Sequence, residues 1–131
     1  MSKFRIYEFH PQIYPRRVWV AVGGTFEDVK ERFTAMNGQE LEESEDCLAT
    51  TYMVQAKRDE HYLGHLVWFP YKNSMTTKNI THESFHLASD MFALLGCKQH
   101  YDNQEPFAYL VGWVADCIDK VKRNKVEFNK V

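Results

Sequence analysis

The fold depends most on residues 76–95, which read TTKNITHESFHLASDMFALL. Thr76 or Thr77 can cap the start of a helix, because a threonine side chain accepts a hydrogen bond from a free amide of the first turn. Gly96 is suited to end that helix. The apolar residues that recur at helical spacing, and so predict a core-facing stripe, are Ile80, Leu87, Met91 and Leu94.

Within this predicted helix, His82, Glu83 and His86 form the pattern H-E-x-x-H. Residues i and i+4 of a helix lie one above the other, so the two histidines can reach one metal ion. Glu83 can hold and deprotonate a water on that metal. A surface helix that binds no metal is the alternative that the pattern leaves open.

A catalytic zinc site generally has three protein ligands and one water, so a third ligand is needed. Glu105 is the candidate, in the first turn of a helix expected to begin near Asp102 or Asn103. Pro106 is tolerated only in such a first turn, which supports this start. If the chain turns back, Gly112, on about the same face as Glu105, would let the two helices approach closely.

The two helices together resemble the gluzincin class of zinc metallopeptidases. Segments 81–86 and 105–112 also resemble small proteins of tailed phages and mobile elements, which carry H-E-x-x-H and then E-x-x-A-Y-L-x-G. The resemblance implies a metallopeptidase in which His82, His86 and Glu105 bind Zn²⁺ and Glu83 is the general base. It also implies that strand 64–69 is the edge strand beside the cleft.

Other residues near the motif are not predicted to bind the metal. Tyr101, His100 and Tyr109 are available to stabilise a negatively charged oxygen, but no motif matches one of them to that role. Asp90, one turn after His86, is expected to bond an imidazole or face solvent rather than bind the metal. A His-His-Glu set also suits iron, nickel or manganese.

The rest of the chain predicts one α+β domain over residues 1–131. A short helix is expected from Thr25 to about residue 37, and the last helix is expected to end near Lys122. We expect a small antiparallel sheet packed on the histidine helix and the glutamate-bearing C-terminal helix, a zincin-like core. Apolar alternation predicts strands at 3–9 and 17–22. Two further β-like runs, at 49–56 and 62–69, predict a hairpin whose second strand is almost continuously apolar, as in a strand covered on both faces. His65 of that strand is expected at the surface or in a groove.

Composition and charge argue against several partners. The net charge is −2 and is spread along the chain, so nucleic acid and membrane are not expected partners. No apolar run approaches the roughly 20 residues that cross a bilayer, and the first residues do not resemble a signal peptide. With three cysteines and no C-x-x-C spacing, this predicts a cytoplasmic protein, in the host cytoplasm if a phage encodes it.

The leading functional prediction is therefore a zinc metallopeptidase that acts on a peptide or protein. The alternative is a non-catalytic metal-binding protein that acts through protein–protein binding. Glu83 favours the enzyme, because a structural zinc site needs no base between its histidines.

Overall fold

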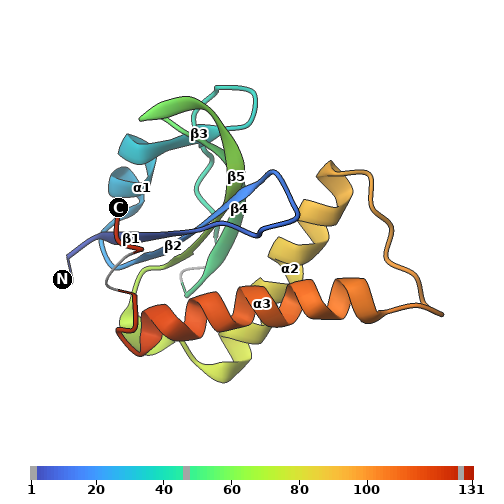
Figure 1. Cartoon of the computed structure of the whole chain (residues 1–131). Coiled ribbons are helices and arrows are strands. Elements are labelled where there is room, and N and C mark those ends of the chain that lie inside the picture. Colours follow the sequence, from blue (N-terminus) through green and yellow to red (C-terminus); the bar gives the residue numbers. More distant parts are fainter. Residues whose placement is uncertain (1–2, 46–47, 127–128) are drawn as a thin grey trace.

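The computed structural model describes residues 3–45, 48–126 and 129–131 of the chain (Figure 1). Its single described sheet has five strands in the order β1-β2-β5-β4-β3. Neighbouring strands are antiparallel except β2 and β5, which are parallel. The strands are β1 (Arg5–Phe9), β2 (Arg17–Val22), β3 (Phe33–Ala35), β4 (Thr50–Ala56) and β5 (Asp59–Phe69).

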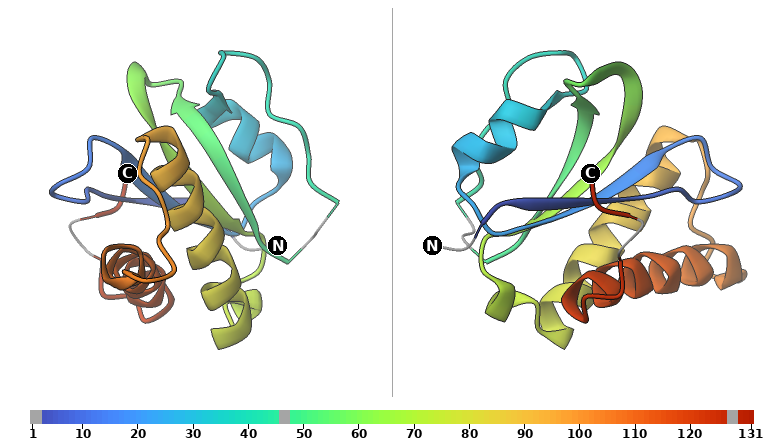
Figure 2. Two further views of the ribbon diagram at one scale, coloured as in Figure 1. Left: turned by 90° about the vertical axis from the view of Figure 1, so that its right-hand side faces the viewer. Right: turned by 60° about the vertical axis from the view of Figure 1, so that its left-hand side comes forward.

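Helices cover both faces of this sheet. Helix α1 (Phe26–Arg32) lies on one face, whereas α2 (Thr77–Leu94) and α3 (Glu105–Lys122) pack on the other (Figure 2). A 3₁₀ turn, η1 (Lys72–Ser74), leads from β5 into α2. Helix α2 lies under β4 and β5, and α3 lies under β2. Among the described residues, no helix is long and apolar enough to cross a membrane.

The central strands separate two hydrophobic cores, one under each face. In β2, Val18, Val20 and Val22 face α2 and α3, whereas Trp19 and Ala21 face α1, and all five are buried. This is the side-chain alternation of a strand that is covered on both sides. In the parallel neighbour β5, a Cβ at Gly64 would overlap the backbone carbonyl of Arg17 and the ring of Trp19, so only glycine fits there.

The chain end covers the outer edge of the sheet at β1. Lys130 pairs with Tyr7, and the amide of Val131 donates to the carbonyl of Ile6 over 2.9 Å. The amide of Glu8 donates in turn to the Asn129 carbonyl over 2.8 Å. Residues 129–131 therefore pair with residues 6–8 of β1 and cover that part of its edge.

The α+β architecture, the β4–β5 hairpin and the bounds of β2 agree with the sequence prediction. Thr76 caps α2 by accepting from the amide of Asn79, and Gly96 follows the helix with a φ of 72°. Helix α3 begins at Glu105, two or three residues later than expected, with Pro106 in its first turn.

Three expectations about the sheet and α1 were wrong. The sheet is mixed rather than antiparallel, because the doubly buried β5 accepts β2 in parallel on one side and β4 on the other. Strand 64–69 is consequently central and not an edge. Helix α1 ends at Arg32 rather than near residue 37, since Phe33 turns its ring onto Trp19 (centroids 5.2 Å apart) and begins β3.

Candidate metal centre

Helix α2 presents different sides to different surroundings. On one flank, Phe85 and Phe92 each pack against Phe107 of α3, with ring centroids 5.3 Å apart in both pairs. With 100° of rotation per residue, His82 and His86 lie about 60° and 100° around the helix from Phe85, on its exposed side. The rings of Phe85 and His86 are neighbours, with centroids 6.4 Å apart. The buried residues of α2 are Ile80, Glu83, Ser84, Leu87, Ala88, Met91 and Phe92.

The two histidines converge as the motif predicts. Their Nε2 atoms are 3.1 Å apart, and the side chain of His82 is 61% exposed. Two nitrogens bound at about 2.05 Å to one tetrahedral zinc would be about 3.3 Å apart. The pair therefore fits a zinc ion after a shift of a few tenths of an ångström. Without metal, one neutral ring can donate its proton to the other at this distance.

Glu83 links the histidines to the sheet. Glu83 is only 5% exposed, and its Oε1 accepts a hydrogen bond of 2.8 Å from the hydroxyl of Thr51 in β4. Its Oε2 lies 3.8 Å from Nε2 of His82. One carboxylate oxygen is thus fixed by the strand while the other faces the histidine pair, which is the orientation that a general base needs.

An open strand edge lies beside this cluster. Strand β3 pairs only with residues 54–56 of β4. Within the described part of the chain, no strand pairs with the outer side of residues 51–53. Thr51 and Met53 point to the α2 face of the sheet, and Met53 is exposed. The histidines are therefore next to a short segment of strand that could still accept a partner.

Glu105 is placed apart from the histidines. It is exposed at the start of α3, about 180° around the helix from the buried stripe that includes Leu110 and Val114. Across residues 3–45, 48–126 and 129–131, no three His, Cys, Asp or Glu side chains lie close enough together to hold a metal ion. The structure thus joins His82, Glu83 and His86 but does not bring Glu105 to them.

The expected role of Gly112 was wrong. This glycine is exposed, and a Cβ built on it would meet nothing within 4 Å. The contact between α2 and α3 is made instead through Phe107. Glu105 and Gly112 share the outer face of α3, so helix rotation moves both away from α2.

The other residues considered for the metal site are not gathered around His82 and His86. His100, Tyr101 and Tyr109 are all exposed, on α3 or on the loop that precedes it. Asp90 is half-buried below His86; burial raises the pKa of its carboxyl, and the charge of His86 acts in the opposite direction.

His65, expected at the surface or in a groove, is fully buried on the α2 face of β5. Neither of its ring nitrogens has a hydrogen-bond partner among the described residues. Burial and the nearby charge of Arg16 lower the pKa of His65 to about 4. This imidazole is therefore neutral at physiological pH.

Thr51 is the site residue that the sequence did not reveal. Strand alternation places it on the same side as Met53, but only the packing of α2 against β4 brings it to Glu83. Comparison with protein-family models, with curated proteins and with solved structures gave no match for this chain.

Proposed function

We propose that the chain is a zinc-dependent peptidase of gluzincin type, with the histidine helix and the adjacent open strand forming a zincin-like core. The observation that carries the proposal is the cluster of His82, Glu83 and His86. Two imidazole nitrogens converge at 3.1 Å, and a buried carboxylate beside them is held in one orientation by Thr51.

Each residue of the cluster then has a distinct task. His82 and His86 hold the metal through Nε2. When bound there, zinc lowers the pKa of a water to about 7 and polarises the substrate carbonyl. Glu83 accepts the proton of the attacking water at Oε2 and passes it to the leaving amine, while Thr51 keeps Oε1 turned towards β4.

The open edge of β4 gives the substrate a place to lie. An extended peptide that pairs with residues 51–53 adds one strand to the sheet, and its backbone supplies the hydrogen bonds. Because Thr51 also touches Glu83, such a peptide would run directly past the histidine pair. We propose a peptide or protein substrate on this basis.

We propose Glu105 as the third zinc ligand. This role requires the first turn of α3 to move towards His86. The residue before this turn, Gln104, makes no side-chain cap bond, and residues 97–104 form no helix or strand. The exposed position of Glu105 leaves its carboxylate accessible for such a rearrangement.

The test is metal content together with hydrolysis of a peptide library. We expect His82→Ala to lose zinc, and Glu83→Gln to keep zinc but lose hydrolysis by about 10²-fold or more. Glu105→Ala should lose most of the zinc, whereas the control Glu31→Ala, at an exposed position of α1, should not. Full zinc content in Glu105→Ala would remove the third ligand. Zinc bound by the wild type without any hydrolysis would refute the peptidase.

The second candidate is a non-catalytic metal-binding protein that acts by binding another protein. It is favoured by the absence of a third ligand near the histidines among the described residues. An apolar groove of about 590 Å³ between the β1–β2 loop and α3, lined in part by Tyr14, Tyr109 and Trp113, offers a surface for such contact. Zinc that binds without supporting hydrolysis would select this function.

A further inference from the structure

A second concave site lies on the opposite face of the sheet from the histidines, where the sheet meets the end of α1. Its volume is about 640 Å³, within the range of roughly 300–1,000 Å³ in which proteins bind small molecules. Ile6, Trp19 and Phe33 form an apolar floor, and all three are buried. The floor of the site is therefore formed by packed core residues of the sheet.

The side chains around this hollow are strongly basic. Those that carry charge are Arg17, Arg32, Arg58 and Lys130, with His10, and among the described lining side chains Glu8 is the only carboxylate. Four cations against the Glu8 carboxylate leave about three positive charges from the described side chains, and the terminal carboxylate of Val131, which also lines the hollow, lowers this to about two. Like charges held close together repel, so this arrangement is stabilised by an anion placed between them.

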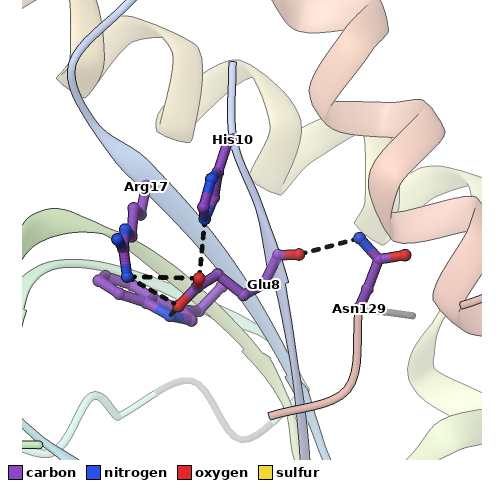
Figure 3. A network of polar contacts seen from close by, with 5 residues as sticks. Glu8, His10, Arg17 and Asn129 are labelled. Carbon is purple, nitrogen blue, oxygen red and sulfur yellow. Dashed lines mark hydrogen bonds and ion pairs between the residues drawn. The ribbon is translucent and has the colours of Figure 1, made fainter. Parts of the chain in front are cut away.

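Glu8 neutralises only part of this positive charge, and its carboxylate is already bonded to neighbouring side chains (Figure 3). It accepts from Nε1 of Trp19 over 2.8 Å, from His10 over 2.7 Å and from Nη1 of Arg17 over 3.4 Å. Burial alone would raise the pKa of Glu8, but the bonds from His10 and Trp19 and the charge of Arg17 outweigh it and lower that pKa. The carboxylate thus serves to orient its neighbours.

Arg17 is held firmly in this network. Its guanidinium carbon lies 3.1 Å from the ring centre of Tyr62, while Glu8 binds Nη1. Arg32 and Arg58, in contrast, have no carboxylate partner among the described side chains. Two guanidinium groups therefore line the hollow without an ion pair to any acidic side chain that the structure describes.

We propose that this hollow, the arginine pocket, binds a small molecule that carries a phosphate group. Guanidinium groups present planar pairs of donors that match the oxygens of phosphate, and several converging arginines favour phosphate over a singly charged anion. The volume allows a ligand larger than phosphate itself. The pocket is separated from the histidine cluster by the sheet, so the proposal does not depend on the peptidase.

The test uses calorimetry and amide NMR shifts of the full chain with inorganic pyrophosphate as the probe. We expect saturable 1:1 binding that weakens with salt, and shifts centred on residues of the arginine pocket. Arg32→Gln and Arg58→Gln should each weaken binding by about tenfold or more, because each removes charge-assisted hydrogen bonds. Arg123→Gln, which removes the same charge from the exposed residue that follows α3, is the matched control and should bind like the wild type.

Several results would overturn this proposal. They are the absence of saturable binding, equal weakening by Arg123→Gln, or citrate binding as tightly as pyrophosphate. The pocket variants keep Glu8 and Arg17 intact, so a loss of binding would not be explained by a disrupted network. His82→Ala should not change pyrophosphate affinity, which keeps failure here distinct from failure of the peptidase.

Discussion

The hydrogen bond from Thr51 to Glu83 is the contact that ties the proposed base to the sheet, and Thr51→Val tests it. Valine keeps the shape of threonine but removes the donor, so Oε1 of a nearly buried carboxylate loses its partner. Hydrogen bonds to charged groups contribute about 1.5–3 kcal/mol, and the partial exposure of Thr51 favours the lower part of that range. We expect a loss of about 2 kcal/mol.

For a chain of 131 residues, the unfolding entropy is about 0.28 kcal/mol/K, so this loss corresponds to about 7 °C in Tm. Urea denaturation and thermal unfolding, both without metal, measure it. Thr51→Ser keeps the donor and is the matched control. In a Glu83→Leu background the acceptor is already gone, so Thr51→Val should there cost less than about 0.5 kcal/mol.

A free energy of unfolding of Thr51→Val within about 0.5 kcal/mol of the wild-type value would contradict this role of the hydrogen bond. An equal loss in Thr51→Ser, or the same loss in the Glu83→Leu background, would contradict it as well. If the reasoning holds, hydrolysis should fall in Thr51→Val because Glu83 is no longer fixed.

Three further predictions concern the sheet and α3. His65 has a pKa of about 4 when folded and about 6.5 when unfolded, so the unfolded chain takes up the proton first and the free energy of unfolding falls by up to about 3 kcal/mol as the pH drops through that window. In His65→Leu, the difference in free energy of unfolding between pH 7.5 and pH 4.5, measured by urea denaturation, should shrink by most of that amount, and an unchanged difference would contradict this. Gly64→Ala should lower stability by about 2 kcal/mol or more through backbone overlap, whereas Gly112→Ala should raise it by about 0.5–1 kcal/mol, with thermal unfolding comparing the two. Trp68→Phe removes the 2.8 Å bond to the Gly23 carbonyl and should cost about 1–3 kcal/mol in urea denaturation; no loss would show that water replaces the indole.

Local patterns were sufficient to predict the elements near the motif. Alternation in residues 17–22 and the threonine at 76 depend on neighbours a few positions away, and both were found as predicted. The order of strands was not predictable in this way. The parallel pairing of β2 with β5 joins residues that are 47 positions apart, such as Val18 and His65, and no local signal encodes it.

The position of Glu105 shows where a spacing argument was incomplete. The stripe of Leu110, Val114 and Val121 was available in the sequence, and rotating α3 to bury it turns Glu105 outwards. A glutamate at a workable distance along the chain is therefore not enough; its angle around the helix must also agree with the core. The arginine pocket, built from residues between positions 6 and 131, gave no local pattern at all.

The β1 edge of the sheet and the part of β4 that β3 leaves unpaired have different consequences for self-association. At β1, residues 129–131 occupy the hydrogen-bonding edge, so a second molecule cannot add a strand there without displacing them. At β4, residues 51–53 carry no charged side chain and no described strand covers them, which makes this segment a template for another copy of the chain. Because it is only three residues long, we expect weak, concentration-dependent dimers rather than fibres, and analytical ultracentrifugation of Met53→Lys beside the wild type would measure how much of that association the open edge supplies.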